Sequence, residues 1–399
     1  VKISLLLFDN SKHFVTMGGQ PTGRYVTTTV AGESVSAFVP DTLPPRLSAK
    51  QLGLLTEPLR AAEAALARLD LAGAMIPSLD WFIYAFVRKE ALLSSEIEGT
   101  QATLVDVLTW EQTDQPGTSS IEDIEEVTNY ISAVNYAFKQ IHSAKGAPIS
   151  VRLFNDCHRM LMRGVRGANK QPGELRRSQN WVGGSRPGNA VFVPPPPERV
   201  GALLGDLERY IHAEGDLAPL LRIALVHVQF ESIHPYLDGN GRLGRMLVAL
   251  LLDHWRLLKS PMLYLSLYLK RNQAAYYRWL GAIRTEGDWV GWLRFFLIGV
   301  AEIAEDAART ASALYARVSE DRKTLLATPG ATITAMQLFE QLPEHPVVTM
   351  PLVTRLVSTS KPTAGKAIDV LIKAGILAEV GDRKRDRLYR YDGYLRLLD

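Results

Sequence analysis

Apolar residues recur at helical spacing through most of the chain. Between Ser48 and about Ala327 they stand three and four residues apart, which is the pattern of helices that bury one face. Two stretches break the pattern: the polar segment 114–120 and the Gly-, Pro- and Asn-rich segment 179–197. We therefore expect a mainly α body, interrupted by one loop and by one β-hairpin that stands on the helical surface.

The beginning of the chain has a different pattern. Residues 1–47 alternate only around Tyr25–Val30 and Val35–Val39 and end in prolines, so we expect an irregular N-terminal arm laid against the body. At the other end, a short linker at 328–331 separates the helical body from the C-terminal segment.

The segment 328–399 predicts a small α+β domain. Met350–Val357 and 361–374 have the spacing of two helices joined by a turn. The stretches 377–380 and 388–391 then alternate like the strands of a hairpin. This order of elements is similar to a winged helix.

Basic charge is concentrated in the same segment. Residues 351–399 hold ten Lys plus Arg against six Asp plus Glu, a net of +4 in a chain whose total is +3. In a winged helix, Thr363 and Lys366 would face outward on the second helix, and the arginines of the loop 381–387 would reach DNA phosphates. Winged helices also serve as protein contacts, so DNA binding and protein binding both stay open.

Length and composition fit a soluble protein of more than one domain and name no function. The 399 residues are 47% apolar and 22% charged, which is ample for a core. The single cysteine, Cys157, excludes an intramolecular disulfide, suits a reducing cytosol and falls in a helical pattern typical of packing. The first apolar run ends at Asp9, too early for a signal peptide or a membrane span. We expect a cytoplasmic protein with no membrane partner.

The most informative segment is His234–Arg245, which reads H-P-Y-L-D-G-N-G-R-L-G-R. Helical patterns precede it at 217–231 and follow it at 242–258, so it forms the junction of two helices. Its G-N-G run at 239–241 can adopt positive φ values that aim backbone N–H groups into one concavity. The dipole of the second helix adds to these donors, and the junction therefore predicts an anion site.

Four side chains of this junction suit phosphoryl chemistry. Arg242 and Arg245 lie three residues apart on one helix face, so both guanidinium groups can bind a polyphosphate. Asp238 is a carboxylate of the kind that holds Mg²⁺ beside phosphate oxygens. His234 titrates near neutral pH and can take a proton from an attacking hydroxyl. Each feature alone is typical of a turn, a helix stop or a solvated arginine, but their combination favours a catalytic site.

The segment resembles the signature of the Fic family, H-x-F-x-[DE]-G-N-G-R-x-x-R, with Tyr236 in place of the usual Phe. The resemblance implies a helical Fic core that transfers AMP from ATP, with Mg²⁺, to a Ser, Thr or Tyr hydroxyl of a target protein or of the enzyme itself. It implies that His234 is the base and that Asp238 binds Mg²⁺. The nucleotide phosphates would lie against Gly239, Asn240, Gly241, Arg242, Leu243, Gly244 and Arg245. Glycine at 241, where phosphate-transferring Doc-like relatives have Lys, favours AMP transfer.

A second motif lies far upstream, at Ser94, Glu98 and Gly99. The stretch 80–98 has helical spacing and Gly99 suits the position after a helix end, so Glu98 would stand where the helix dipole disfavours a negative charge. The three residues resemble the inhibitory pattern of Fic proteins, [ST]-x-x-x-E-[GN]. The resemblance implies that Glu98 binds Arg245 and keeps it from the γ-phosphate, and that Glu98 can also position a water for removal of AMP. An exposed Glu in a common pattern is the alternative.

Residues 181–193 predict the hairpin. Apolar residues flank its turn, and the prolines at 194–197 give it an extended exit. The hairpin is similar to the flap of Fic proteins, whose free edge would pair with an extended segment of the target protein. The residues expected to border the nucleotide are Val182, Gly183 and Gly184 of the flap. Tyr276 and Tyr277 could line the adenine side, with a core role as the alternative for both tyrosines.

These predictions divide the chain into an N-terminal arm (1–47), a helical region with the inhibitory helix (48–118), a Fic catalytic core (119–327) and a winged-helix domain (328–399). Two functions compete. The favoured one is an autoinhibited protein adenylyltransferase, and the alternative is a winged-helix DNA-binding regulator whose Fic core senses nucleotide. A complete set of signature residues favours chemistry, because a sensor would not need a base. The oligomeric state stays open, a homodimer included.

Overall fold

The computed structural model describes residues 22–74, 80–113, 115, 117–144, 146–380 and 387–398. The helices of the body are α1 (Ala49–Ala74), α2 (Asp80–Ile97), α3 (Leu104–Thr113), α4 (Ile121–Ile141), α5 (Val151–Leu161), the 3₁₀ turn η1 (Pro187–Asn189), α6 (Pro197–His212), α7 (Pro219–Ile233), α8 (Asn240–His254), α9 (Ser266–Arg271), α10 (Gln273–Glu286) and α11 (Trp289–Ala327). Helices therefore dominate the body, as the apolar spacing predicts. Among the described helices, none is long and apolar enough to cross a membrane.

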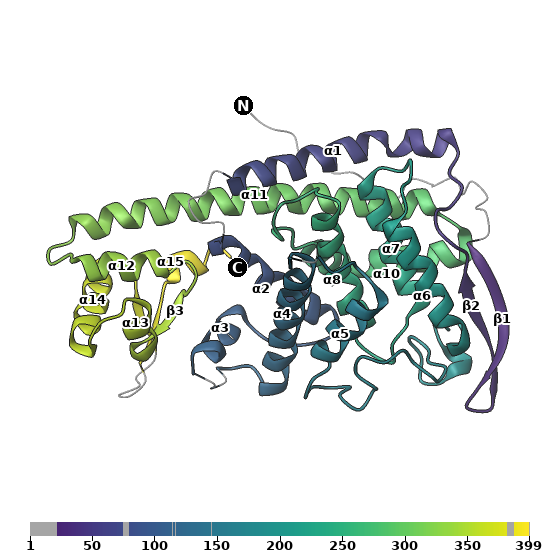
Figure 1. Ribbon diagram of the computed structural model, residues 1–399, viewed down its shortest axis with the longest axis horizontal. Helices are drawn as coiled ribbons and strands as arrows, with labels where there is room; N and C mark the ends of the chain where they lie inside the picture. The colour runs from purple at the N-terminus through teal and green to yellow at the C-terminus, as the bar shows by residue number, and fades with distance from the viewer. Residues whose placement is uncertain are drawn as a thin grey trace.

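Two long helices, α1 and α11, run side by side along the top of the molecule in Figure 1. Helix α11 has 39 residues. The buried positions where the two helices face inward include small residues, Ala62 and Ala65 on α1 and Ala304 and Ala307 on α11. Small side chains let helix backbones approach closely, so this pair forms a rigid spine for the rest of the body.

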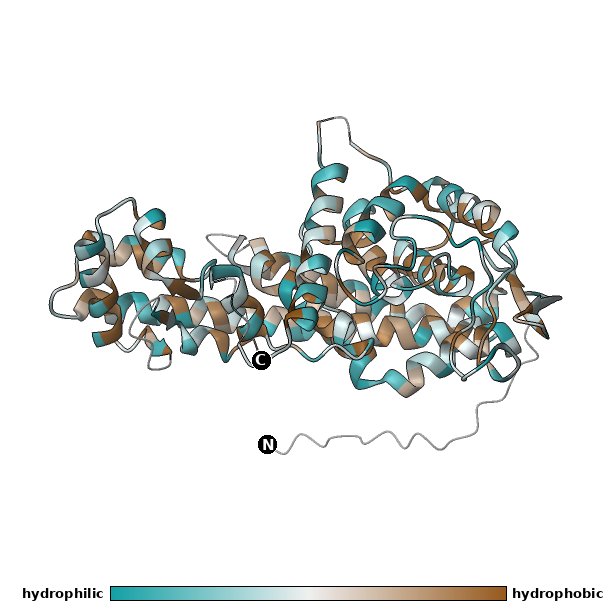
Figure 2. Cartoon of the chain, turned by 90° about the horizontal axis from the view of Figure 1, so that it is seen from below, coloured by the Kyte–Doolittle hydropathy of each residue, from teal (hydrophilic) through white to brown (hydrophobic). Residues whose placement is uncertain are grey.

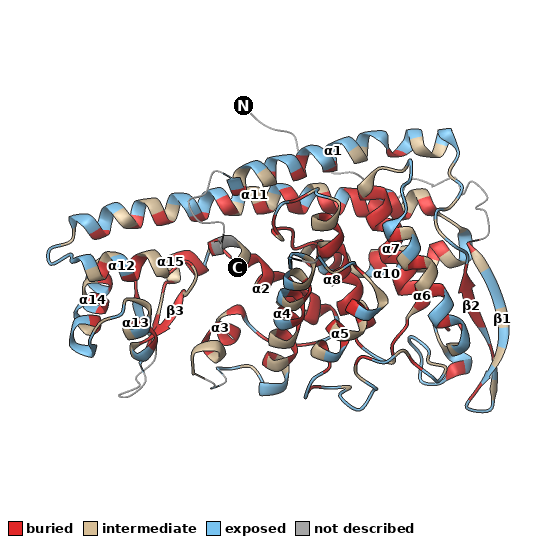
Figure 3. Ribbon diagram, viewed as in Figure 1, coloured by how far each residue is buried: buried red, intermediate tan, exposed pale blue. Residues whose placement is uncertain are grey.

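Helices α7 and α8 form the centre of the core below this spine (Figure 3). Every residue of α7 from Leu220 to Ile233 is buried. A helix that is buried all round needs neighbours on all sides, and α7 is packed by α6, α8, α10, α11, α1 and a strand of the N-terminal hairpin. The surrounding helices turn their brown, apolar faces inward and their teal, polar faces outward in Figure 2. The loop between α7 and α8 is therefore anchored on each side by a helix that is packed in the core.

Cys157 has the packing role that its helical pattern indicates. It lies on α5 and is 1% exposed, with its thiol 3.8 Å from the carbonyl oxygen of Ala133. Burial raises the pKa of this thiol to about 12, so it carries no thiolate for catalysis.

The N-terminal arm is regular where the structure describes it. Strands β1 (Gly23–Val30) and β2 (Glu33–Pro40) pair antiparallel, with Gly23 opposite Pro40 and Val30 opposite Glu33. Ala31 and Gly32 have φ values of +50° and +83°, which is the geometry of a tight two-residue hairpin turn. The expectation of an irregular arm is wrong for residues 23–40. The rest of that expectation, residues 1–21, lies outside the described part of the chain.

The C-terminal segment contains α12 (Ile333–Gln341), β3 (Val347–Thr349), α13 (Met350–Leu356), α14 (Lys361–Lys373), β4 (Ala378–Val380), β5 (Leu388–Arg390) and α15 (Asp392–Leu395). The expected pair of helices and the expected hairpin are present. Strand β3 was not expected; it adds a third strand, in the order β3-β5-β4. Thr363 and Lys366 are exposed on α14, as expected, whereas residues 381–386 of the basic loop lie outside the described residues.

This C-terminal unit is joined to the body by buried contacts. The Tyr391 hydroxyl donates to Asp321 on α11 at 2.5 Å, and the Tyr394 hydroxyl lies 3.5 Å from the carbonyl oxygen of Trp81 on α2. The last turns of α11 therefore pack with the C-terminal unit, although the sequence pattern places them in the helical body.

Candidate active site

His234 stands at the end of α7 in a strained conformation. Its φ of +49° and ψ of +62° are left-handed, which is unfavourable for a residue with a side chain. Its ring hydrogen-bonds to the backbone carbonyl of Glu231, one turn earlier. Burial first, and then the positive charge of Arg176, lower the pKa of His234 to about 4. The imidazole is therefore neutral near pH 7 and can accept a proton.

Asn240, the first residue of α8, closes the loop that follows His234. Its side-chain Oδ1 accepts from the backbone N–H of Tyr236 at 2.9 Å, and its Nδ2 donates to the carbonyl oxygen of Tyr236 at 2.9 Å. Each end of the amide thus makes one hydrogen bond to the loop. Asn240 can still offer an anion its backbone N–H, one of the unpaired donors at a helix start, and the second hydrogen of its Nδ2.

The N-terminus of α8 faces the end of α2. Gly239 precedes α8 with a φ of +73°, which aims the first N–H groups of the helix into one concavity. A Cβ atom at Gly241 would lie 2.3 Å from Oε1 of Glu98 and 2.9 Å from Nη1 of Arg245. The Glu98 carboxylate therefore rests on the surface at which the sequence predicts bound phosphate.

Arg245 is bound entirely by residues of the upstream motif. It is 4% exposed. Its Nε donates to the Ser94 hydroxyl at 2.9 Å, and its Nη2 donates to the Ser94 carbonyl at 2.7 Å and to Oε1 of Glu98 at 2.7 Å. The pairing of Glu98 with Arg245, implied by the resemblance to Fic proteins, is present in the structure.

Gly99 ends α2 in the way that the sequence predicts. It has a φ of +98°, its N–H donates to Glu96 at 3.1 Å, and the N–H of Thr100 donates to Ser95 at 3.2 Å. These two bonds and the left-handed glycine form a Schellman cap, in which Glu98 is the capping residue that follows Ile97, the last residue of the helix. The carboxylate thus stands near unpaired carbonyl oxygens, and the guanidinium of Arg245 offsets that repulsion.

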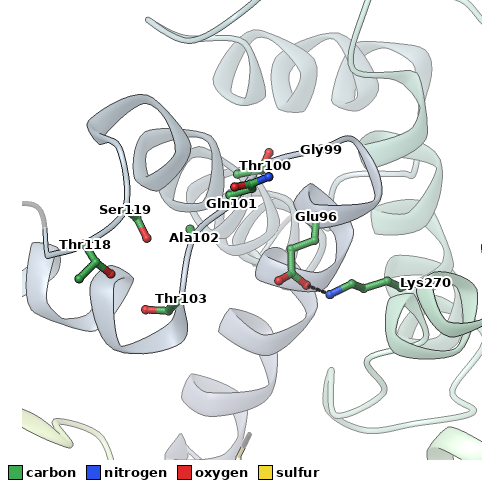
Figure 4. A pocket seen from close by; sticks show the side chains of 9 residues that line it. All are labelled: Glu96, Gly99, Thr100, Gln101, Ala102, Thr103, Thr118, Ser119 and Lys270. Carbon is green, nitrogen blue, oxygen red and sulfur yellow. Dashed lines mark hydrogen bonds and ion pairs between the residues drawn. The ribbon is translucent and has the colours of Figure 1, made fainter.

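The outer side of this helix end is fastened to its neighbours. Figure 4 shows the ion pair between Glu96 and Lys270, whose atoms are 2.6 Å apart, beside a cavity of about 460 Å³ lined also by Thr103, Thr118 and Ser119. One residue beyond Gly99, the Thr100 hydroxyl donates to Glu126 on α4 at 2.5 Å. Contacts of the residues before and after Glu98 therefore fix its position.

Arg242 is a buried cation with open hydrogen-bonding capacity. It is 3% exposed. Its Nη2 lies 3.5 Å from the sulfur of Met162 and its Nη1 lies 3.8 Å from a carboxylate oxygen of Glu126. Its Nε and Nη1 have no hydrogen-bond partner among the described residues. Such donors are costly to bury, which is explained if an anion binds them.

Asp238 is exposed in the same loop, and its Oδ1 accepts from the N–H of Gly239 at 2.7 Å. In the part of the chain that the structure describes, no group of three His, Cys, Asp or Glu side chains could hold a metal. A single carboxylate fits Mg²⁺ that takes its remaining ligands from nucleotide phosphates and water. Asp238 therefore suits a Mg²⁺ ion that binds together with the nucleotide.

The flap is less regular than expected. Instead of a two-stranded hairpin it has one β-bridge, between Val182 and Phe192, and the short turn η1. Gly183 and Gly184 have φ values of +68° and +74°, and Pro187 has no N–H to give to a ladder. These three residues explain why strand pairing stops after one bridge.

The edge of the flap is partly occupied by the N-terminal hairpin. The N–H of Phe38 on β2 donates to the carbonyl of Val193 at 2.9 Å, and Arg186 pairs with Glu33 at 2.6 Å. The apolar side chains at the bridge remain open, with Val191 at 83% exposure, Val182 at 38% and Trp181 at 36%.

The two tyrosines expected near adenine have different surroundings. Tyr276 is 1% exposed, and its hydroxyl lies 2.9 Å from Nε2 of the buried His227, so it has the core role that the sequence left open. Tyr277 is 49% exposed and is the one of the pair that can contact a ligand.

Glu231 is a buried carboxylate beside His234 that the sequence patterns did not predict. Glu231 is 8% exposed, its Oε1 has no hydrogen-bond partner within the described structure, and burial raises its pKa to about 7. A Cβ atom at Gly244 would lie 2.4 Å from this oxygen. A signal was available, since an acidic residue in an apolar helix one turn before a catalytic His needs an explanation.

The sequence matches known proteins over both motifs. Residues 56–139 match the Fic/DOC family N-terminal region, and residues 148–252 match the Fic/DOC family. The protein adenylyltransferase Fic of Drosophila erecta is 31% identical over 171 residues, which are 42% of this chain and 31% of that protein. The Drosophila melanogaster protein of the same name is 30% identical over 42% of this chain and 32% of its own length. The match therefore spans about a third of the length of these relatives.

Solved structures share the fold. A Fic family protein from Desulfovibrio desulfuricans G20 superposes with a TM-score of 0.54 at 20% identity, over 87% of this chain and 97% of that chain. Residues 134–508 of Fic-1 from C. elegans superpose with a TM-score of 0.51 at 21% identity, over 65% of this chain and 72% of that one. The two family matches contain the upstream motif and the signature, so the chain contains the N-terminal region and the domain of the Fic/DOC family.

Proposed function

We propose that the protein is an adenylyltransferase that moves AMP from ATP to a hydroxyl of a target protein. The observation that carries the proposal is the single loop in which a neutral His234 precedes the N-terminus of α8 and two buried arginines. This arrangement offers a base and a phosphate site within a few residues of each other. The Drosophila relatives are named protein adenylyltransferase, which supports the same reaction.

In the proposed reaction the target hydroxyl attacks the α-phosphorus of ATP. The hydroxyl proton passes to His234, the new O–P bond joins AMP to the target, and the bond to pyrophosphate breaks. The N–H groups at the start of α8 and the free donors of Arg242 hold the phosphates, and Arg245 would hold the γ-phosphate. Bound by Asp238, Mg²⁺ would neutralise phosphate charge as the pyrophosphate leaves.

We infer further that the enzyme is autoinhibited by its own α2. Glu98 occupies Arg245 and the space above Gly241. A γ-phosphate cannot take the same guanidinium while the carboxylate holds it, so ATP would bind in a geometry unfit for attack. The same carboxylate, close to the phosphate site, is placed to orient a water for hydrolytic removal of AMP, which is a second activity that we propose for the site.

The target protein is proposed to dock on the flap, residues 181–193. Trp181, Val182 and Val191 expose apolar surface there, and unpaired backbone groups beside a bridge can receive an extended segment. The N-terminal hairpin already takes the carbonyl of Val193. Val182 likewise gives its N–H and its carbonyl to the bridge. The proposed contact is therefore the exposed apolar surface of Trp181, Val182 and Val191, with backbone pairing only at residues beside the bridge.

A DNA-binding regulator with a nucleotide-sensing core is the second candidate. The observation that favours it is the C-terminal unit, in which Thr363 and Lys366 are exposed on α14, beside a three-stranded sheet, as in the proposed winged helix. This candidate does not account for a neutral base at His234. We therefore place DNA binding, a homodimer and a cytoplasmic location as secondary proposals.

The test is to incubate the protein, and separately its Glu98→Gly variant, with ATP labelled at the α-phosphate and Mg²⁺ in a cell lysate. Label on protein, lost in a His234→Ala version of the same variant that still binds ATP and keeps its thermal midpoint, supports the proposal. In a parallel incubation with ATP labelled at the γ-phosphate, label on protein would indicate phosphate transfer instead. No protein label with intact ATP binding would favour the sensor.

A further inference from the structure

Arg176 is a buried cation that the signature does not include. It lies between α5 and the flap and is 2% exposed. Its Nε donates to the carbonyl of His234 at 2.9 Å. Its other nitrogens donate to the carbonyls of Ile233 at 3.4 Å, Ser178 at 3.4 Å and Pro195. Among the described residues, no carboxylate forms an ion pair with it within 4.0 Å.

The same short segment binds the loop carbonyls one after another. The backbone N–H of Arg176 donates to the carbonyl of Pro235 at 3.0 Å, and Asn180 donates through Nδ2 to the carbonyl of Tyr236 at 3.1 Å. Together with the guanidinium, these contacts take the four successive carbonyls from Ile233 to Tyr236. Because His234 is left-handed, its carbonyl leaves the helix direction and needs such an outside donor.

A buried guanidinium without a paired carboxylate is costly. Burial lowers the pKa of Arg176 to about 10. The guanidinium therefore stays charged at neutral pH, but its charged form is less stable in this buried position than in water. Neutral donors could bind carbonyls without this cost. The charge itself therefore needs a reason. Glu198 raises the pKa of Arg176 without forming an ion pair within 4.0 Å, and the positive charge of Arg176 in turn lowers the pKa of His234.

The other groups that face this ring come from separate elements. Arg284 on α10 also favours the neutral ring, Glu98 on α2 favours the protonated one, and the carbonyl of Glu231 on α7 accepts its hydrogen bond. Arg284 is stacked over Phe192 of the flap at 3.8 Å, so its contribution depends on the flap. The position of Arg176 is instead fixed by its hydrogen bonds to the loop, so its effect on the proton affinity of His234 does not depend on the flap.

We propose that Arg176 is a positioning residue of the transfer reaction, which holds His234 in its left-handed turn and turns a fixed positive charge toward the imidazole. The proposal rests on the proposed function. The proposal has two parts. The geometric part is that Arg176 holds the His234 turn, which affects the rate of transfer. The electrostatic part is that its charge lowers the proton affinity of His234. Two substitutions separate the parts, since Arg176→Lys keeps the charge without the planar fork, and Arg176→Gln removes the charge.

Arg222 is a matched control. It is 8% exposed and its guanidinium donates to the carbonyls of Tyr210 and Ala213, both at 2.7 Å, at the end of α6. Arg222→Lys and Arg222→Gln should therefore reproduce the loss of stability from a buried carbonyl-binding arginine. They should leave the chemistry of the site alone.

All variants are made in the full chain carrying Glu98→Gly. The measurements are thermal midpoint, kcat and KM for ATP from pH 4 to 8, and titration of the His234 ring by NMR, assigned by its loss in His234→Gln. We expect Arg176→Lys to lower kcat at least about tenfold. The KM for ATP, and the pH at which kcat falls in acid, should stay nearly unchanged. We expect Arg176→Gln to move the His234 titration by about one pH unit toward the ordinary value of about 6.5.

The proposal is overturned if Arg176→Gln shifts neither the ring titration nor kcat beyond what Arg222→Gln does. If Arg176→Gln does not fold, Arg176→Lys decides: an unchanged kcat per folded molecule also overturns it. A parent chain that transfers no AMP at all removes the proposed function instead. In that case the NMR titration still tests the electrostatic part without any activity.

Discussion

Oε1 of Glu98 lies 2.7 Å from Nη2 of Arg245, across 147 residues of sequence. The contact joins the residue that caps α2 to the helix whose N-terminus is the proposed anion site. Because the carboxylate also covers Gly241, one side chain occupies both a buried arginine and the surface over the backbone N–H groups beside it. In the proposed enzyme, ATP and Glu98 therefore compete for the same surface.

The first prediction concerns pH. Burial and Arg176 lower the pKa of His234 to about 4 from an ordinary value near 6.5. A base works only when unprotonated, so transfer should persist through pH 6.5 and fall as pH drops toward about 4. The measurement is kcat/KM for ATP in the Glu98→Gly variant at saturating Mg²⁺. Loss of activity with a midpoint at pH 6.5 or above, in protein shown to be folded, would contradict the assignment of His234 as a neutral base.

The second prediction concerns the outer fastening of α2. Lys270 pairs with Glu96 at 2.6 Å, and both side chains are partly exposed. Lys270→Glu replaces attraction with repulsion beside the helix end, and partly exposed pairs are worth at most about 1 kcal/mol. Basal transfer should therefore rise a few-fold at most, well short of the effect of removing Glu98.

Lys259→Glu is the control for that substitution. Lys259 pairs with Asp70 at 3.1 Å and its side chain is 80% exposed, far in sequence from the inhibitory motif. The same charge reversal there should leave basal transfer unchanged. Equal effects of the two variants would mean that the Glu96–Lys270 pair does not help to hold the inhibitory helix.

The sequence predicts the parts of the site whose geometry is local. The Schellman cap at Gly99 follows from a helical pattern that ends before a glycine. The helix start after Gly239 follows in the same way, and so does the side of α14 that presents Lys366. In each case residues within a few positions decide the conformation.

Contacts between distant segments leave no such signal. The loop carbonyls are bound by Arg176, 58 residues before His234, and Arg242 approaches Glu126 from another helix. The flap also misled prediction, because its flanking apolar residues indicate a hairpin, whereas its glycines and Pro187 end the pairing after one bridge. The N-terminal segments alternate around Tyr25–Val30 and Val35–Val39, yet the arm was expected to be irregular; in the structure β1 and β2 pair across the turn at Ala31 and Gly32.

The third prediction concerns DNA. Arg383 and Arg385 belong to the basic loop predicted from the sequence. If the C-terminal unit binds DNA, Arg383→Ala with Arg385→Ala should weaken binding about equally for all sequences and flatten its salt dependence, because phosphate contacts are lost. Arg60→Ala with Arg177→Ala, two exposed arginines elsewhere, should change neither. If the unaltered protein has no affinity for DNA at low salt, the unit is a protein contact.

The fourth prediction concerns the inhibitory pair itself. The Glu98 side chain is 38% exposed and that of Arg245 is 2% exposed, so the pair is worth less than a fully buried one. About 1.4 kcal/mol corresponds to a factor of ten, and we expect Glu98→Gly to raise AMP transfer, self-modification included, by at least about tenfold. Arg245→Ala breaks the same pair but removes the phosphate-binding cation, so it should not activate. Glu57→Gly, at an exposed position on α1, is the control.

The most direct test of autoinhibited AMP transfer is therefore to compare these three variants with the unaltered chain in one assay. Transfer from ATP labelled at the α-phosphate is measured at saturating Mg²⁺, and the mass of the modified protein is determined in parallel. The account predicts strong labelling by Glu98→Gly, with the mass increase of AMP, and no gain from Arg245→Ala or Glu57→Gly. It is contradicted if Glu98→Gly is no more active than the unaltered chain, or if Arg245→Ala activates to the same extent.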